Sequence, residues 1–323
     1  MRSSTGPTHP GISVVIPNYN GADLLAANLP GLFEALAFSG ADHEVIISDD
    51  ASTDGSVAFL KENYPGIVLL TSPVNTGFSP NINRGIARAS KELTFLMNTD
   101  IRLEKDFFVP LFDYFSDPEV FGVMGRIVGM NDDKTQDSAK YPKWNGLQVD
   151  GSANYLPSSG TRAPSLFLSG AEALVETEKL KSLGGFDEAF APFYGEDLDL
   201  GLRAWRGGWT CWYEHSAVCR HKTSSTISRH NKPGAIRAIA ARNKFRLHYI
   251  HLDLPSLLLW IPVVLLNLIV KSLTLKFYYP RGLALFLRDI GAAAASRRKV
   301  PDKYTLRQVY RKITRTLSAD RIR

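Results

Sequence analysis

"ISVVIPNYNGADLLAANLPGLFEALAF", residues 12–38, is the stretch that decides the fold. It begins with a short β-branched run that Pro17 ends, and apolar side chains at helical spacing follow. The same order of strand, loop and helix recurs in three further segments, residues 43–64, 67–90 and 92–115. Because parallel neighbouring strands need crossover helices, four such units predict an α/β fold with a doubly wound, mostly parallel sheet and flanking helices.

Polar side chains follow each predicted strand at its carboxyl end, where sheets of this class bind ligands. They are Asn18 and Asn20, Asp49 and Asp50, Asn75, and finally Asn98 and Asp100. The first loop contains neither a GxGxxG motif nor a Walker sequence, which argues against a dehydrogenase and a P-loop enzyme. If a nucleotide binds, a divalent cation, Mg²⁺ or Mn²⁺, is expected to hold its phosphates. Asp100 is the best candidate ligand, and His221 is a second.

The composition is that of a globular protein with a substantial core, since 44% of the 323 residues are hydrophobic. The two cysteines, Cys211 and Cys219, lie eight residues apart and are interpreted as buried thiols in a reducing compartment. Residues 1–10 form a polar lead without the pattern of a secretory signal. We therefore expect the working part of the chain to be cytoplasmic.

The net charge of +6 comes from the C-terminal tail. Residues 271–323 contain 14 Lys and Arg against three acidic residues, so the rest of the chain is net negative. Nucleic-acid binding would depend on this tail alone, and its aromatic residues adjoin an apolar stretch rather than alternate with the arginines. We expect no nucleic-acid partner, and we expect the tail to be attracted to anionic membrane lipid.

The apolar stretch, residues 254–270, has no charged residue over 17 positions, which is the lower limit for spanning a bilayer. A single span would separate the basic tail from the catalytic part, although an excess of Lys and Arg favours the cytoplasmic face. A re-entrant or in-plane segment keeps both parts on the cytoplasmic side of the cell membrane, and we favour it. The alternative is an ordinary buried helix packed on the catalytic domain.

The chain is predicted to comprise four regions. They are the polar lead of residues 1–10, a catalytic domain of residues 11–230, a basic amphipathic helix of residues 231–253, and residues 254–323 with the apolar membrane-associated segment and the polybasic helical tail. Residues 129–164 are polar and turn-rich without a clear period. They are interpreted as a long loop or small excursion over the site. Trp144 and Tyr155, in this excursion, are candidate contacts for a second substrate.

An acidic helix start, "GEDLD" at residues 195–199, carries two adjacent carboxylates, Glu196 and Asp197. An acidic first turn is common on surface helices, where the positive end of the helix stabilises negative charge. The alternative is a catalytic pair, because adjacent carboxylates on a helix diverge and can serve two roles. Asp199 and Arg203 are spaced to form an ion pair along the same helix.

Seven segments in order resemble the inverting nucleotide-sugar glycosyltransferases of family 2, which have the GT-A fold, and in particular their rhamnosyltransferase-like branch. The segments are "VVIPNYN", "SDDASTDGS", "NTGFSPNINRGIARA", "FLMNTD", "GGFDE", "GEDLDLGLRAWRGGW" and "RHKTSST". The resemblance covers about residues 11 to 226 and implies a GT-A catalytic domain.

The resemblance also implies roles for individual residues. The donor site would be formed by Pro17, Tyr19, Asp50, Asn75, Gly77, Asn83, Asn98 and Thr99, with Tyr19 and Asp50 at the base of a UDP-, dTDP- or GDP-linked sugar. The metal-binding DxD position corresponds to residues 98–100, where Asn98 replaces the first acid. Asp100 would therefore carry the metal contact, with His221 near the diphosphate.

Inverting transfer requires one carboxylate to take the proton of the acceptor hydroxyl as that hydroxyl attacks the anomeric carbon. Asp197 is the predicted general base, and Glu196 is predicted to orient hydroxyl groups. The apolar segment and basic tail suggest a lipid-linked or cell-envelope glycan as acceptor. Two alternatives stay open: a polyprenyl-phosphate glycosyltransferase, and a non-catalytic membrane-bound protein that binds nucleotide sugars.

Overall fold

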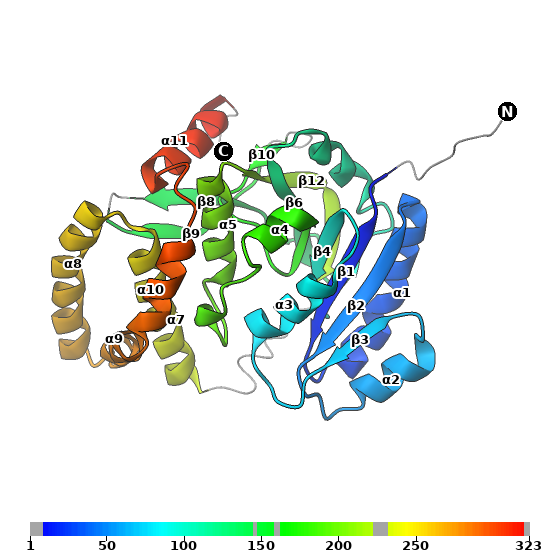
Figure 1. The fold of residues 1–323 in the computed structure, drawn as a ribbon, viewed down its shortest axis with the longest axis horizontal. Coiled ribbons are helices and arrows are strands. Elements are labelled where there is room, and N and C mark those ends of the chain that lie inside the picture. The colour runs from blue at the N-terminus through cyan, green and yellow to red at the C-terminus, as the bar shows by residue number, and fades with distance from the viewer. Residues whose placement is uncertain (1–8, 145–146, 158–161, 222–231, 320–323) are drawn as a thin grey trace.

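β1 (Ile12–Asn18) lies inside the central sheet of the computed structural model, which describes residues 9–144, 147–157, 162–221 and 232–319. Its neighbours are β2 (His43–Asp49) and β4 (Leu93–Met97), and β3 (Val68–Thr71) follows β2. All three pairings are parallel. The connecting helices are α1 (Ala22–Ser39), α2 (Ser56–Asn63) and α3 (Phe78–Arg88), shown in Figure 1. The predicted doubly wound arrangement is confirmed.

Helices cover both faces of this sheet, which explains why β1 is apolar along its length rather than alternating. Val14 and Ile16 belong to the core under α1, whereas Val15 belongs to the core on the opposite face under α3. Gly85 of α3 lies so close to the sheet that a Cβ there would be 2.4 Å from Val15 Cγ1. This close packing fixes the position of α3 and of the loop that leads into it.

The second half of the sheet is mixed. β11 (Glu172–Glu176) runs antiparallel between β4 and β6 (Val120–Gly129), and β12 (Thr210–His221) runs parallel to β6. The sheet is completed by β5 (Ile101–Leu103), β7 (Thr135–Asp137) and β10 (Ala163–Pro164). β5 pairs antiparallel with β12, so that His221 lies opposite Ile101. This pairing brings the end of β12 to the residue that follows Asp100.

Two segments differ from the expectations of the sequence. The helix expected over residues 105–115 is a 3₁₀ helix, η1 (Val109–Ser116), with Pro110 in its first turn. The excursion of residues 129–164 contains a hairpin of β8 (Ala139–Trp144) and β9 (Val149–Tyr155). The register of this hairpin shifts between Tyr141 and Lys143. A shift of this kind hides the period of two that identifies a strand in a sequence.

The face of the sheet under α3 also carries α4 (Thr177–Ser182), η2 (Glu188–Phe190) and α5 (Glu196–Gly207), which follow β11 in the chain. Cys211 and Cys219 of β12 are both buried and free, as predicted. The helix expected to start near a proline is α7 (Pro233–His251). Four further helices follow α7 in the chain: α8 (Leu254–Leu273), α9 (Tyr278–Arg288), α10 (Ile290–Lys299) and α11 (Leu306–Ala319). Of these, α9 and α10 pack on α7.

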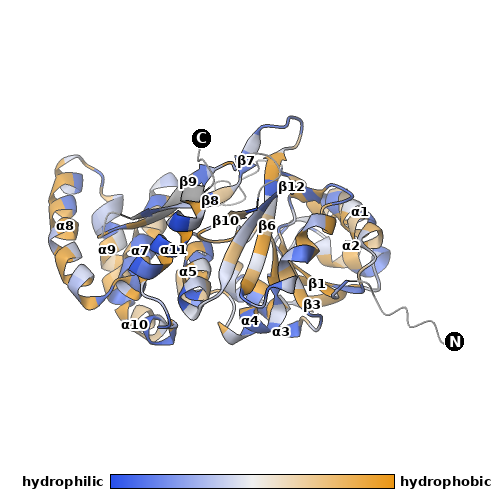
Figure 2. Ribbon diagram, turned by 90° about the horizontal axis from the view of Figure 1, so that it is seen from above, coloured by the Kyte–Doolittle hydropathy of each residue, from blue (hydrophilic) through white to orange (hydrophobic). Residues whose placement is uncertain are grey.

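α8 lies at the outer edge of the molecule (Figure 1), and most of its residues are hydrophobic (Figure 2). Leu266 and Leu273 are 63% and 78% exposed, whereas Trp260 and Val264 are buried. By length and composition α8 could cross a membrane, and only 11% of its apolar window is buried. The alternative of an ordinary buried helix is therefore wrong, because most of these apolar side chains are exposed.

Candidate active site

The acid pair lies in the first turn of α5, directly after two residues with positive φ, Tyr194 (75°) and Gly195 (97°). Glu196 is 8% exposed. Asp197 is partly exposed as a residue, but its Oδ1 is shielded from solvent and has no hydrogen-bond partner within the described part of the chain. A shielded carboxylate oxygen without a donor is costly in a purely structural role, so this turn has the character of a functional site.

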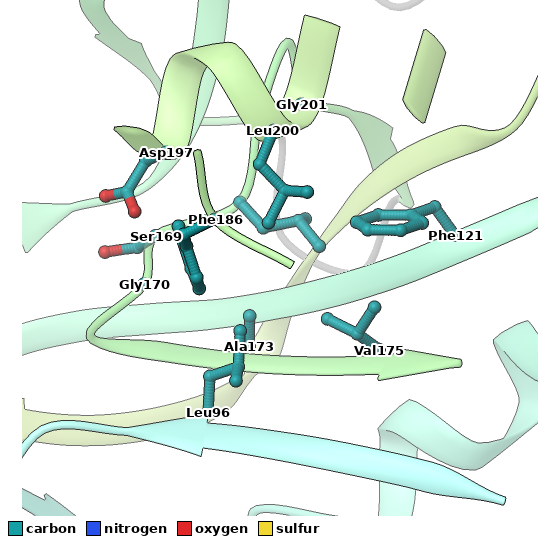
Figure 3. Close-up of a pocket in the computed structure, with 11 residues that line it drawn as sticks. Leu96, Phe121, Ser169, Gly170, Ala173, Val175, Phe186, Asp197, Leu200 and Gly201 are labelled. Atoms are coloured by element: carbon teal, nitrogen blue, oxygen red, sulfur yellow. The ribbon is translucent and has the colours of Figure 1, made fainter. Parts of the chain in front are cut away.

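A small pocket lies beside Asp197 (Figure 3). Its apolar wall is formed by Leu96, Phe121, Leu168, Ala173, Val175, Phe186 and Leu200. Figure 3 shows the Asp197 carboxylate and the Ser169 hydroxyl pointing to the same side, away from this wall. The backbone of Gly170 packs directly on the carboxylate, because a Cβ at this position would lie 2.6 Å from Asp197 Oδ1. The geometry of the acid therefore depends on a glycine at residue 170.

Burial raises the pKa of Asp197, although the Gly170 backbone N–H and the charge of Lys140 oppose this shift. Burial also raises the pKa of Glu196, and the adjacent charge of Asp197 raises it further. Two close carboxylates do not ionise independently. The charge of Asp197 raises the pKa of Glu196 further, whereas the Gly170 N–H and Lys140 lower that of Asp197, so Asp197 is the member of the pair that ionises first and can accept a proton.

Asp100 and His221 are brought together by the pairing of β5 with β12. His221 Nε2 lies 3.2 Å from Asp100 Oδ2, and His221 Nδ1 lies 2.8 Å from Gln136 Oε1. The hydrogen bond to Asp100 raises the pKa of His221. Asp100 Oδ1 is buried without a hydrogen-bond partner in the described residues, as expected of a carboxylate oxygen that is available to a cation.

Two charged side chains of the excursion, Asp137 and Lys140, act electrostatically on the predicted site residues. Lys140 Nζ pairs with Asp137 Oδ1 and lies 2.9 Å from Asn154 Oδ1. The charge of Asp137 acts on the pKa values of both Asp197 and His221. Asp137 is thus within electrostatic range of both groups, and their union in one site stays a prediction. The sequence analysis missed Asp137 and Lys140, because their segment shows no period and no motif.

Asp50 is held entirely by protein donors. Its Oδ2 accepts hydrogen bonds from the N–H groups of Thr76 and Gly77 at 2.8 and 2.9 Å. Its Oδ1 accepts the Thr76 hydroxyl at 2.8 Å and lies 3.1 Å from Arg84 Nη2. Asn75 Oδ1 also accepts from the Gly77 N–H, at 3.1 Å. In this structure Asp50 anchors the loop of residues 75–77, and a contact with the donor base stays a prediction.

Asn83 is also engaged within the protein. Its Nδ2 donates to the Phe186 carbonyl at 2.8 Å, and its Oδ1 accepts from the Phe186 N–H at 2.9 Å. The amide therefore ties α3 to the segment before η2. Both polar atoms of Asn83 are used, so the structure gives it a bracing role, and its place in the donor pocket stays a prediction.

The remaining predicted donor residues gather at the carboxyl ends of β1 and β4, which are adjacent in the sheet. Pro17 is half-buried in β1, and Tyr19 is 37% exposed in the loop that follows. The Asn98 N–H donates to the Ala171 carbonyl at 2.9 Å, and the Thr99 carbonyl accepts from Asn28 Nδ2 at 2.7 Å. The fold thus groups these residues, and their contacts with a donor stay predictions.

The two candidate acceptor residues lie on the hairpin. Trp144 ends β8, and its side chain lies outside the described part of the structure. Tyr155, in β9, is 8% exposed and donates its hydroxyl to the Pro164 carbonyl. It lines a groove together with Tyr141, Lys143 and Asn154. A contact of Tyr155 with an acceptor would have to use its ring, and it stays a prediction.

The family described as Glycosyl transferase family 2 matches residues 13–175, which is half of the chain. An N-acetylglucosaminyl-diphospho-decaprenol L-rhamnosyltransferase of Mycobacterium tuberculosis is 27% identical over 208 residues, which are 56% of this chain and 67% of the relative. The fold is similar to that of GalNAc-T7 with UDP, GalNAc and Mn²⁺, with a TM-score of 0.60, 14% identity, and coverage of 77% of this chain and 49% of that one. It is also similar to that of the mannosyltransferase PcManGT from Pyrobaculum calidifontis in complex with GDP-Man and Mn²⁺, with a TM-score of 0.54, 19% identity, and coverage of 90% and 88%. The resemblance drawn from the sequence motifs is confirmed: the chain belongs to glycosyltransferase family 2, is similar to a rhamnosyltransferase of that family, and is a glycosyltransferase.

Proposed function

We propose that this glycosyltransferase inverts the anomeric centre as it moves a sugar from a nucleoside-diphosphate donor to a hydroxyl of a lipid-linked or cell-envelope glycan. The observation that carries the mechanism is the shielded Oδ1 of Asp197, which has no hydrogen-bond partner among the described residues; the contact of His221 with Asp100 supports a second, metal-binding part of the site. The name of the Mycobacterium tuberculosis relative, which specifies a sugar on diphospho-decaprenol, supports the acceptor class.

Asp197 serves as the general base. It removes the proton of the acceptor hydroxyl while the hydroxyl oxygen forms a bond to the anomeric carbon on the face opposite the leaving diphosphate. The bond from the anomeric carbon to the diphosphate oxygen breaks, and the nucleoside diphosphate leaves. Glu196, protonated because of its burial and the neighbouring Asp197 charge, donates a hydrogen bond that orients a substrate hydroxyl.

Asp100 and His221 would hold a divalent cation, Mn²⁺ or Mg²⁺, and the open Oδ1 of Asp100 fits this role. Among the described residues no group of three or more His, Cys, Asp or Glu side chains is placed to hold a metal. Two protein ligands are nevertheless sufficient where the phosphates of the substrate supply further oxygens. When bound, the cation would neutralise the charge that develops on the departing diphosphate. The Mn²⁺ in the two similar solved structures supports this part of the proposal.

The membrane side of the proposal depends on α8. Its exposed leucines favour burial in a lipid surface, and basic residues at its end and beyond, from Lys271 to Arg281, favour an anionic one. An in-plane or re-entrant α8 on the cytoplasmic side of the cell membrane keeps the site in the compartment that contains nucleotide sugars. The acceptor would then meet the enzyme at the membrane surface.

A donor screen tests the proposal. Wild-type protein and Asp197→Asn are assayed for release of nucleoside diphosphate from UDP-, dTDP- and GDP-linked sugars, with Mn²⁺ and a polyprenyl-diphosphate sugar as acceptor. A general base contributes on the order of 100-fold or more, so Asp197→Asn should lose at least this factor in kcat and still bind donor. Wild-type turnover by Asp197→Asn would refute the base. Transfer to polyprenyl phosphate alone would favour the alternative acceptor class.

A further inference from the structure

The turn that carries the acid pair is held from outside the catalytic sheet, by α7. Asn243 of α7 is 2% exposed, and its Nδ2 lies 2.7 Å from the Phe190 carbonyl, 2.9 Å from the Phe193 carbonyl and 2.8 Å from the Tyr194 carbonyl. One amide nitrogen thus gathers three backbone carbonyls in the five residues that precede Gly195. This position requires a hydrogen-bond donor, because an acceptor atom there would repel the three carbonyl oxygens.

Two arginines of α7 hold the same segment further upstream. Arg242 Nη2 donates to the carbonyls of Phe190 and Ala191, and Arg242 Nε donates to Asn243 Oδ1 at 2.9 Å. Arg246 has a fully buried side chain; it donates to the Ala189 carbonyl and lies 2.5 Å from Asp289 Oδ2. The arginine heads therefore point into the protein, although the sequence predicts a basic surface for this helix. Their hydrogen bonds fix the Asn243 side chain as well as the backbone it holds.

The other end of the contact lies one turn into α5. His251, the last residue of α7, places its Nε2 2.9 Å from Asp199 Oδ1, and Arg203 binds Asp199 Oδ2 at 2.7 Å. His251 and Asp199 are 1% and 0% exposed. α7 therefore contacts both the segment before the acid pair and the residue two positions after Asp197. The pair lies between these two attachments.

The backbone between the attachments is strained. Tyr194 has a φ of 75°, a conformation that side chains other than glycine rarely adopt, and its carbonyl is one of the three that Asn243 holds. Strained residues persist where surrounding contacts over-determine them, and such residues are typical of functional sites. The contact with Asn243 accounts for the persistence of this turn.

We propose that Asn243 is a positioning residue for the acid pair, so that the C-terminal helices form part of the catalytic unit. The proposal rests on the assignment of Asp197 as the base. α7 is joined to the exposed apolar helix α8 by two residues, Leu252 and Asp253. α7, which holds the turn before the base, is thus followed directly in the chain by α8, the helix proposed to meet the lipid surface.

The test replaces Asn243 by alanine in the full chain, which leaves three carbonyls without their shared donor. We expect kcat to fall at least tenfold, because a displacement of about 1 Å at a reacting group can cost on the order of 100-fold. The donor Kd is expected to change less than threefold, because within the described residues Asn243 Nδ2 bonds the carbonyls of Phe190, Phe193 and Tyr194 and no predicted donor residue. Hydrogen exchange should become faster in peptides from residues 190–200, where the Asp199 N–H donates to the Gly195 carbonyl at 2.9 Å.

The matched control is Tyr114→Phe. Tyr114 lies on η1, and its hydroxyl donates a buried hydrogen bond of 2.8 Å to Glu214 on β12, which the substitution removes. It should lower the melting temperature without changing kcat or the exchange of residues 190–200. Arg242→Met, which keeps the aliphatic stem, is the second variant, and it decides the test if Asn243→Ala does not fold. It should change kcat and exchange in the same direction by a smaller factor.

The outcomes separate this proposal from the assignment of the base. If Asp197→Asn is inactive while Asn243→Ala retains wild-type kcat and exchange, only the positioning role is refuted. If Asp197→Asn is fully active, the base assignment is refuted, and exchange in the Asn243→Ala variant still shows whether the turn is held. A loss of kcat in Tyr114→Phe as large as that in Asn243→Ala would reduce the effect to general destabilisation and would also refute the proposal.

Discussion

Replacing Gly170 by alanine would press a methyl group on the predicted base. The new Cβ would lie 2.6 Å from Asp197 Oδ1, whereas ordinary contacts begin at 3.4 Å, so the carboxylate has to retreat. The required movement is about 0.8 Å, and a misplacement of about 1 Å can cost on the order of 100-fold in rate. We therefore expect kcat to fall roughly ten- to hundredfold. The backbone N–H of residue 170 remains in place, so the substitution shifts the Asp197 carboxylate without removing a hydrogen-bond donor.

The assay is donor turnover at saturating acceptor, with donor affinity and thermal unfolding measured in parallel. Overpacking costs about 1–3 kcal/mol of stability, and the cost here should lie at the low end because the displaced atom ends a side chain. Gly66→Ala is the matched control, since a Cβ there meets no atom within 4 Å. A Gly170→Ala enzyme with wild-type kcat would show that the position of this carboxylate does not limit the reaction, which contradicts its role as base.

Further expectations concern the metal pair, the buried ion pair, the membrane helix and pH. Asp100→Ala should weaken donor binding that depends on Mn²⁺, and an unchanged Mn²⁺ titration would place the cation elsewhere. Asp199→Asn leaves Arg203, 5% exposed, without its ion-pair partner and should cost about 3–5 kcal/mol in denaturant unfolding. Burial raises the pKa of Asp199, but Arg203 and His251 outweigh this effect and lower the pKa. The ionised carboxylate therefore contributes to folding stability above pH about 4, and this contribution is lost as the pH falls further. The difference in unfolding free energy between wild type and Asp199→Asn should accordingly become smaller below pH about 4. Aspartate substitutions at Leu266 and Leu273 should release the protein from anionic vesicles without unfolding it, because both side chains are exposed, and retention on the vesicles would contradict the role of α8. Because burial raises the pKa of Asp197, kcat should rise with pH through a midpoint above that of an ordinary aspartate, about 4, and the acidic limb should vanish in a variant that lacks this base.

Much of the sheet could be predicted from the sequence because its first half is built from local units. In residues 12–97 a crossover helix joins each strand to the next, so apolar runs and helical periods show the order of elements directly. The second half has no such rule. β11 enters between β4 and β6 from far along the chain, and the hairpin of β8 and β9 has an irregular register, so neither produces a local pattern.

The candidate site divides in the same way. Asp197, Glu196, Asp100 and His221 could be named from motifs, and the pairing of β5 with β12 places the last two side by side. Asp137 and Lys140 could not be named, because they come from the excursion and reach the site only through the fold. Asp50 and Asn83 were named for a donor contact, but the structure shows that their polar atoms hold the loop of residues 75–77 and the Phe186 backbone.

The sequence by itself determined the α/β class, the parallel first half of the sheet, the family and the residue types of the chemistry, since each of these is written in short-range spacing. Only the tertiary structure decided that the C-terminal helix α7 holds the turn before Asp197, and that α8 leaves its apolar side chains exposed. Contacts such as that of Asn243 with Tyr194 join residues 49 positions apart. No local period encodes a contact of this kind, because it exists only after the sheet and the helices have packed.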